Sequence, residues 1–292
     1  MVDTADVVDP GRSRVFGEVA EVYDYARPGY ADALVAEVLA YAEPGGRGRA
    51  VLEIGAGTGK ATVLFAEALG GTSGGAFAGV LGGVCPELVC VEPDARMAQV
   101  LRRNTENHPG VRVHLGAFED WRSDGREFGL AFAATSWHWT DPRRRWDLVH
   151  DALVSGGALA LFWNPQGVRD ADLHAALVAV DRRHGVTGAP HGVLASSFGE
   201  VPGHWAGLPA AWPEDECRRD GRFTDLRSVR YRQDLSYDTD RYLGCLASLS
   251  GYRVLPPARR EAALAETAEI LDAHGGGIPM TLFNDLFLAR TN

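Results

Sequence analysis

The sequence predicts an α/β fold with a doubly wound, mostly parallel sheet and an inserted helical cap. Buried-strand patterns alternate with helical apolar spacing between residues 49 and 163, which is typical of parallel strands covered by helices on both faces. The first strand runs into a glycine-rich loop and then a helix, as nucleotide-binding sheets do. Residues 165–222 break the alternation and are rich in Gly, Pro, Trp and His, so we interpret this segment as the cap.

Each element is expected from its local pattern. Helical spacing extends from Phe16 to about Tyr41, and Pro28 should divide it into two helices because proline breaks a helix interior. The alternating units that follow are a strand at 49–54, a helix at 61–69, a strand at 88–91, a helix at 96–104, strands at 111–115 and 130–134, a helix at 143–152 and a strand at 158–163. Beyond the cap we expect a strand at 228–235, helices near 239–249 and 258–273, and a strand at 280–289.

This order divides the chain into four parts. They are a flexible tail at 1–15, a ligand-binding core at 16–165, a cap on the substrate side at 166–227, and C-terminal strands and helices at 228–292 that complete core and cap. Within the core, the glycine-rich stretch 70–84 is low in complexity, and we expect it to be a flexible insertion.

The overall composition limits the classes of function. The 292 residues carry 39 acidic and 29 basic side chains, and the resulting net charge of −10 argues against a dedicated nucleic-acid-binding protein. No uncharged apolar run approaches the ~20 residues of a membrane span, and the first residues lack the apolar region of a secretory signal. The four cysteines form no CxxC pair, and the histidines show no metal-ligand spacing. We therefore expect a cytoplasmic protein without a metal site and without nucleic-acid or membrane partners.

The glycine loop after the first strand reads EIGAGTGK, and three kinds of ligand compete for it. A phosphate-binding P-loop would need a glycine where Ile54 stands and a hydroxyl where Ala61 stands. The dinucleotide fingerprint would use Gly55 and Gly57 but needs Gly or Ala at the position of Lys60. What remains is the GxGxG pattern of Gly55, Gly57 and Gly59 with Glu53 just before it, and this pattern fits neither phosphate binder.

The loop resembles motif I of the class I S-adenosylmethionine-dependent methyltransferases, which have a Rossmann-like fold. Further motifs follow in the family's order: V-E-P-D-A-R-M (91–97), G-A-F-E-D-W (116–121), A-T-S-W-H-W-T-D-P (134–142) and L-V-S-G-G-A-L-A-L (153–161). Upstream, F-G-E-V-A-E-V-Y-D-Y-A-R-P-G-Y (16–30) is similar to the entry helix of a small-molecule subgroup that includes trans-aconitate-type enzymes. The resemblance spans roughly residues 16–165.

This resemblance implies that S-adenosyl-L-methionine is the cofactor. It assigns the ribose hydroxyls to the Glu92 carboxylate, since a carboxylate is a bidentate acceptor for a vicinal diol. It also implies that Tyr23 and Arg27, one helical turn apart, close over the methionine carboxylate. The full set of cofactor-binding residues is expected to be Tyr23, Arg27, Glu53, Gly55, Ala56, Gly57, Glu92, Pro93, Met97, Ala117, Phe118, Glu119 and Ala134.

The chain departs from the family pattern at two places. Glu53 and Glu92 lie 39 residues apart, about twice the ~20 residues that usually separate the loop from its acidic partner. We attribute the excess to the glycine-rich stretch. The family often carries an acidic residue where Ala117 stands, so the adenine would be held by the Phe118 backbone, by apolar walls and by Glu119.

The predicted function is methyl transfer to the oxygen, nitrogen or carbon of a small-molecule acceptor held under the cap. His138, just past the fourth strand, is a candidate general base, which is needed only if the nucleophile arrives protonated. Trp137, Trp139, Trp205 and Tyr252 are candidates for an aromatic acceptor pocket, although aromatic side chains of this kind also build cores. Two alternatives stay open: non-methyl chemistry such as cyclisation or elimination on the same fold, and a non-catalytic protein that binds the cofactor.

Overall fold

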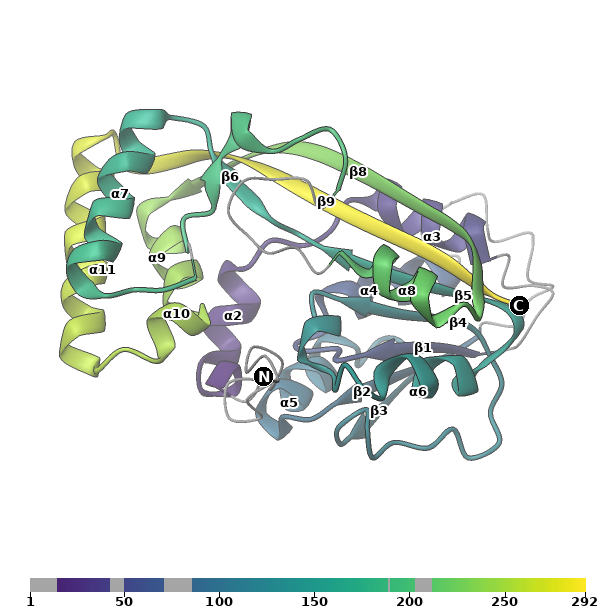
Figure 1. Ribbon diagram of the computed structural model, residues 1–292. Coiled ribbons are helices and arrows are strands. Elements are labelled where there is room, and N and C mark those ends of the chain that lie inside the picture. The colour runs from purple at the N-terminus through teal and green to yellow at the C-terminus, as the bar shows by residue number, and fades with distance from the viewer. Residues whose placement is uncertain (1–14, 43–49, 71–85, 189, 203–211) are drawn as a thin grey trace, which may run out of the picture.

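A computed structural model describes residues 15–42, 50–70, 86–188, 190–202 and 212–292 of the chain (Figure 1). Almost all of the predicted tail, almost all of the glycine-rich stretch and Trp205 lie outside these residues. The described strands are β1 (Ala50–Ile54), β2 (Glu87–Glu92), β3 (Val111–Leu115), β4 (Phe128–Ala134), β5 (Leu153–Trp163), β6 (Gln166–Val168), β7 (Val193–Leu194), β8 (Phe223–Asp238) and β9 (Gly277–Thr291). The described α-helices are α2 (Ala20–Ala26), α3 (Asp32–Ala42), α4 (Lys60–Gly70), α5 (Ala95–Asn104), α6 (Arg145–Ala152), α7 (Ala171–His184), α8 (Pro213–Asp220), α9 (Thr239–Ala247), α10 (Ser250–Arg253) and α11 (Pro257–Ala273). Short 3₁₀ turns are η1 (Val15–Val19), η2 (Trp137–Trp139) and η3 (Ala195–Ser197).

The described strands form one sheet in the order β3-β2-β1-β4-β5-β9-β6-β7, with β8 pairing to β9. The five strands from β3 to β5 are parallel, and successive side chains point to opposite faces. Val51 therefore packs on the side of α3 and α4, whereas Leu52 packs on the side of α6 and α8. The predicted doubly wound, mostly parallel α/β sheet is confirmed.

The last strands add an antiparallel half to this sheet. β9 runs antiparallel to β5, and β8 pairs with β9 from Phe223 opposite Thr291 to Asp238 opposite Gly277. In Figure 1 these long strands connect the sheet to a cluster of helices at one end of the molecule. β8 is longer at both ends than the strand predicted at 228–235, because its backbone continues to pair with β9 from Phe223 to Asp238.

The helical cluster at this end is assembled from two separate parts of the chain. α7 comes from the segment predicted as the cap, whereas α9, α10 and α11 follow β8. Their buried apolar side chains meet in one core that includes Leu177, Leu246 and Leu271. The rest of the predicted cap segment contributes β6 and β7 to the sheet and α8 to the face covered by α6.

A buried ion pair joins β8 to β9. The Arg230 guanidinium donates from Nε and Nη2 to the two carboxylate oxygens of Asp285, each at 2.6 Å, and only 6% and 5% of these side chains are exposed. The substitution Arg230→Met is expected to lower the free energy of unfolding by about 3–5 kcal/mol, because it leaves a buried carboxylate unpaired. Urea denaturation measures this loss. The double variant Arg230→Met/Asp285→Leu should recover most of the stability, and a single variant as stable as the wild type would contradict the assignment.

Candidate functional site

The carboxyl ends of β1, β2 and β4 open into a cavity of about 1320 Å³. Ligands of doubly wound sheets bind at this edge, outside the carboxyl ends of the strands. The cavity walls come from α2, the loops after these three strands, α8 and the junction of α9 with α10. Since most single-ligand pockets measure ~300–1,000 Å³, this cavity has room for a large ligand and a second small molecule.

The glycine loop approaches the rest of the cavity wall closely. Gly55, Gly57 and Gly59 all have positive φ angles, of 69°, 60° and 92°, which favour glycine. A Cβ atom added to Gly55 would lie 2.6 Å from the Cβ of Ser136, whereas one added to Gly57 would meet only the Met97 methyl at 3.8 Å. Gly55 is thus required for close packing against the loop after β4, and Gly57 leaves its outer side open to the cavity.

These two glycines provide a matched pair of substitutions. Gly57→Ala is expected to cost about 1 kcal/mol of folding free energy, since it adds only backbone strain. Gly55→Ala is expected to cost about 2 kcal/mol or more, because Ser136 must also move. Thermal and urea denaturation of both variants measure the difference. Equal losses would show that the close contact with Ser136 does not restrict this position.

Glu92 ends β2 with a buried carboxylate whose side chain faces the glycine loop. Oε2 accepts a hydrogen bond from the Gly57 amide at 2.8 Å, and Oε1 accepts one from the Asp94 amide at 2.9 Å. Burial raises the pKa of this carboxyl to about 7 despite the two amide donors. Each oxygen retains acceptor capacity for one more donor, and the residue lines the cavity. The carboxylate is therefore placed to accept two neighbouring hydroxyls.

Glu53 lies under the glycine loop and is fully buried. Its Oε2 accepts hydrogen bonds from Thr62 Oγ1 at 2.5 Å and from Cys90 Sγ at 3.5 Å, which ties β1 to α4 and β2. Oε1 has no hydrogen-bond partner, and the residue contributes to the cavity wall. Burial raises the pKa of Glu53 to about 8, so the carboxyl is mainly protonated at neutral pH. In this geometry Glu53 both supports the glycine loop and belongs to the cavity wall, as its predicted place in the cofactor site requires.

Tyr23 and Arg27 lie on the same side of α2 and its C-terminal end, and both line the cavity. The Arg27 guanidinium carbon is 5.0 Å from the centroid of the Tyr23 ring. Its Nε donates to Ser248 Oγ at 2.8 Å, which connects α2 to the end of α9. The pair is thus fixed as a unit in the cavity wall.

His138 faces the cavity from η2, in the loop after β4. Its Nδ1 accepts a hydrogen bond from Trp163 Nε1 at 3.3 Å, and an indole nitrogen can only donate. The neutral imidazole therefore carries its proton on Nε2, and its basic nitrogen is engaged. The side chain is open to the cavity, but the surrounding walls and the positive charge of Arg145 lower its pKa to about 4. This geometry suits a hydrogen-bond donor better than the predicted general base.

The structure corrects two of the aromatic assignments. Trp139 lines the cavity, but Trp137 packs edge-on against Trp146 in the core and is only 2% exposed. Tyr252 is fully buried among α7, α9 and α11, where its hydroxyl donates to Asp181 Oδ1 at 3.3 Å. Neither of these two side chains reaches the cavity, because each fills a hydrophobic core instead.

The other residues predicted to bind the cofactor all belong to the cavity wall. They are Ala56, Pro93, Met97, Ala117, Phe118, Glu119 and Ala134. Glu119 has a second contact: its Oε1 accepts a hydrogen bond from the Asp141 amide at 2.7 Å. This bond joins the turn after β3 to the loop after β4, and both of these segments belong to the cavity wall.

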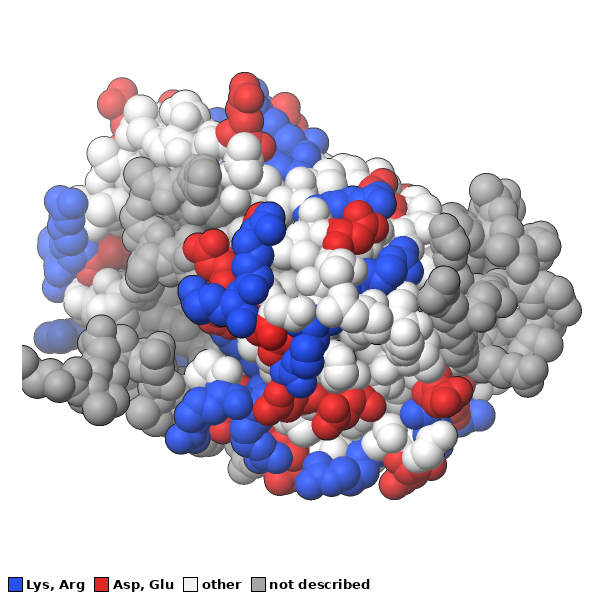
Figure 2. All heavy atoms as spheres, turned by 45° about the vertical axis from the view of Figure 1, so that its right-hand side comes forward, with Lys and Arg blue, Asp and Glu red and all other residues white. Residues whose placement is uncertain are grey.

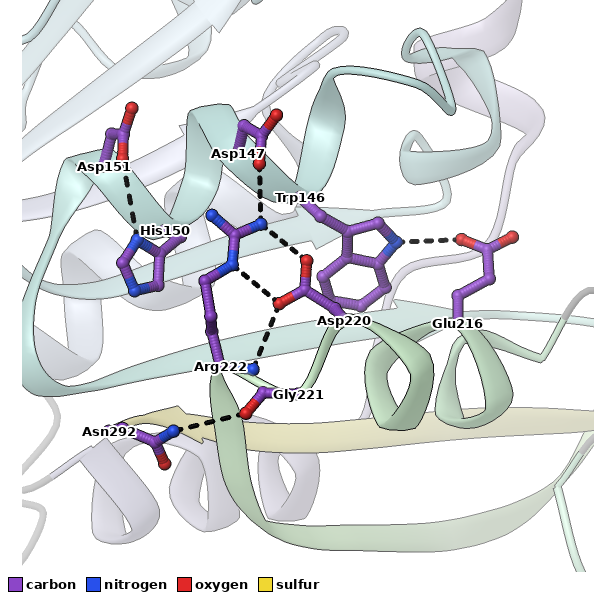
Figure 3. Close-up of polar contacts among 9 residues, drawn as sticks. All are labelled: Trp146, Asp147, His150, Asp151, Glu216, Asp220, Gly221, Arg222 and Asn292. Carbon is purple, nitrogen blue, oxygen red and sulfur yellow. Dashed lines mark hydrogen bonds and ion pairs between the residues drawn. The ribbon is translucent and has the colours of Figure 1, made fainter.

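Sequence reasoning missed the contribution of α8. Glu216, Arg219 and Asp220 line the cavity from this helix. Glu216 Oε2 accepts a hydrogen bond from Trp146 Nε1 at 2.9 Å and one from Arg145, as Figure 3 shows for the indole. At the other end of α8, Asp220 pairs with Arg222, which also reaches Asp147 of α6 (Figure 3). Pro213 followed by acidic residues is a helix-start signal from which α8 could have been predicted, but nothing local indicates that this helix lines the cavity.

Three further cavity residues, Tyr30, Thr135 and Asn164, were also missed. They come from the α2–α3 connection, the end of β4 and the end of β5, and they form a hydrogen-bonded chain. Thr135 has a φ angle of 57°, which is unusual for a β-branched residue and often marks a functional site.

On the face shown in Figure 2, Lys and Arg lie interspersed with Asp and Glu and form no continuous basic surface. The described residues bring together no group of three His, Cys, Asp or Glu side chains suited to a metal ion. No described helix is both long and apolar enough to span a membrane.

Solved structures share this fold. A protein from Anaeromyxobacter dehalogenans, named provisionally as a type II methyltransferase, superposes with a TM-score of 0.53 at 21% identity, over 90% of this chain and 97% of that one. YjhP from Escherichia coli superposes with a TM-score of 0.50 at 12% identity, over 96% of this chain and all of the other. The chain therefore has the Rossmann-like fold found in class I methyltransferases.

Sequence comparison identifies relatives with higher sequence identity. Uncharacterized methyltransferases of Mycobacterium tuberculosis and Mycobacterium bovis are 31% identical over 154 residues, which is 53% of this chain and 54% of theirs. The chain thus spans about half the length of the curated relatives it matches. No family model matches the sequence.

Proposed function

We propose that this protein is an S-adenosylmethionine-dependent methyltransferase acting on a small molecule. The observation that carries the proposal is the pairing of the GxGxG loop with Glu92. The carboxylate bonds the Gly57 amide and keeps a lone pair on each oxygen for a vicinal diol in the cavity. The relatives of known name are methyltransferases, which agrees with this choice of ligand.

The residues around the loop fit this cofactor in three respects. Gly57, which has a positive φ angle, leaves open space on its outer side where a ligand can approach. Glu53 Oε1, buried and without a partner, offers a polar contact beside the loop. Arg27, held by Ser248, offers a guanidinium for a carboxylate. When bound, the cofactor would supply a methyl group activated by its sulfonium.

The protein's contribution to such a reaction is mainly alignment. Holding the two reactants in line supplies several kcal/mol of the barrier, and this needs rigid walls. Glu119 joins the turn after β3 to the loop after β4, and Glu216 fastens α8 to α6 across the cavity mouth. The N-terminal segment resembles the trans-aconitate-like subgroup, so we extend the proposal to a small-molecule acceptor held in the same cavity.

The direct test is the release of S-adenosylhomocysteine. The protein is incubated with S-adenosylmethionine labelled in its methyl group and with the small-molecule fraction of a cell extract. We expect S-adenosylhomocysteine to form and the label to appear in an acceptor, with Glu92→Ala losing both. Cofactor binding without turnover would favour the non-catalytic alternative. Cofactor breakdown without labelled acceptor would favour non-methyl chemistry, and either result would overturn the proposal.

A further inference from the structure

The three cavity residues Tyr30, Thr135 and Asn164 form a hydrogen-bonded chain with a fixed direction. Tyr30 Oη is 2.9 Å from Thr135 Oγ1, and Thr135 Oγ1 is 3.2 Å from Asn164 Oδ1. Asn164 Nδ2 donates to the carbonyl oxygen of Pro28 at 3.2 Å. All three residues line the cavity, and the Tyr30 ring is held edge-on against Phe162 at a centroid distance of 4.9 Å.

The direction of the chain follows from its last member. The Pro28 carbonyl can only accept, so the Asn164 amide must present its NH₂ group there and its oxygen to Thr135. The Thr135 hydroxyl must then donate to that oxygen, because two lone pairs would otherwise face each other. With its proton committed, Thr135 Oγ1 accepts from Tyr30, so the Tyr30 proton points into the chain and away from the cavity.

The exposed side of Tyr30 Oη therefore offers only lone pairs. Burial raises the pKa of Tyr30 well above its ordinary value, so the phenol stays neutral and does not act as a base. The reversed arrangement would require the Asn164 amide to turn its oxygen toward the Pro28 carbonyl, which is unfavourable. The αL conformation of Thr135 holds its hydroxyl between the two neighbours.

We infer that Tyr30 Oη forms a subsite for a ligand N–H or O–H group, which favours a hydroxyl- or amine-bearing methyl acceptor over a carboxylate. This inference rests on the proposed function for the identity of the ligand as an acceptor. The direction of the hydrogen bonds does not depend on that function, because it follows from Tyr30, Thr135 and Asn164 themselves. A carboxylate would place its oxygen lone pairs against those of Tyr30, whereas a hydroxyl or amine donates directly.

The test uses three small probes of one skeleton: benzyl alcohol, benzylamine and benzoate. Their dissociation constants are measured by ligand-observed NMR with the S-adenosylhomocysteine-loaded protein and with the ligand-free protein. The wild type is expected to bind the alcohol and the amine more tightly than benzoate. Tyr30→Phe should weaken the alcohol about three- to tenfold, the size of one neutral hydrogen bond. It should weaken the amine, which is an ammonium ion near neutral pH, at least as much, and leave benzoate unchanged.

Thr135→Val is the second variant, and it tests direction instead of mere contact. It keeps the β-branched shape but removes the group that accepts the Tyr30 proton, so the phenol becomes free to donate. The affinity of this variant for benzoate should then rise relative to its affinity for the alcohol. If Thr135 had a purely structural role, the substitution would change the affinities for all three probes equally, and that result would overturn the inference.

The remaining outcomes are also decisive. A wild type that binds benzoate best, or binds neither donor probe, overturns the subsite, as does a Tyr30→Phe variant with unchanged affinities for all ligands. If Tyr30→Phe instead weakens S-adenosylhomocysteine alone, Tyr30 contacts the cofactor, and the inferred preference for a hydroxyl- or amine-bearing acceptor is overturned. If the wild type does not bind S-adenosylhomocysteine, the proposed function fails, while the ligand-free measurements still decide on the subsite.

Discussion

Glu92→Ala is expected to weaken S-adenosylhomocysteine binding by about 100-fold or more. The carboxylate would accept two ribose hydroxyls, and each hydrogen bond to a charged group contributes at least ~1.5 kcal/mol. The substitution also leaves the Gly57 and Asp94 amides without their acceptor, which loosens the loop that receives the ligand. Titration calorimetry at about pH 8 measures the loss, since Glu92 is then ionised.

The same residue predicts a pH dependence. The pKa of Glu92 is raised to about 7, so its charged form is present mainly above neutral pH. The wild-type affinity should therefore rise as the pH increases through 7, and the affinity of Glu92→Gln should stay flat. Asp120→Asn, which removes an exposed carboxylate from the same cavity, serves as the charge control and should bind as the wild type does. If Glu92→Ala binds S-adenosylhomocysteine as tightly as the wild type does, Glu92 does not bind the ribose hydroxyls.

The second large effect concerns stability and the buried Glu53. Its pKa in the folded protein is about 8, against an ordinary value of 4.5 that applies when the chain is unfolded. Between these values the folded state binds a proton that the unfolded state does not, so the free energy of unfolding falls as the pH rises from about 4.5 to about 8. Glu53→Gln cannot ionise, and it should be more stable than the wild type at pH 8 by an amount on the order of a few kcal/mol.

Urea denaturation at pH 5 and at pH 8 measures this difference. Glu92 also lowers the free energy of unfolding as the pH rises, up to its pKa of about 7. Both proteins contain Glu92, so its contribution cancels when they are compared. Glu106→Gln, at an exposed position, is the matched control and should follow the wild type. If wild type and Glu53→Gln lose stability in parallel between the two pH values, the carboxyl does not carry its proton in the folded state.

The parallel half of the sheet was predictable because its signals are local. The strand predicted at 111–115 is β3, and the helix predicted at 96–104 is α5 with one residue added. The strand predicted at 158–163 begins earlier, at Leu153, so that Gly156 and Gly157 lie within β5. An irregular register with β4 and a φ angle of 72° at Gly156 absorb the glycines within the strand.

The acceptor side of the cavity was not predictable in the same way. Trp137 and Trp139 are two residues apart and carry the same chemistry, but a 3₁₀ turn directs one into the core and the other into the cavity. Tyr30, Thr135 and Asn164 meet only after three distant segments are folded together. Local pattern identifies a loop that receives a ligand, whereas long-range packing decides which side chains face it.

The central claim is that the cavity binds S-adenosylmethionine and not another nucleotide. Titration calorimetry of the full chain with S-adenosylhomocysteine tests it most directly, with NAD and ATP as competitors for the two rival uses of a glycine loop. We predict saturable binding of S-adenosylhomocysteine at one site per chain, undisturbed by a large excess of NAD or ATP. Absence of binding, or displacement by either competitor, would contradict the account.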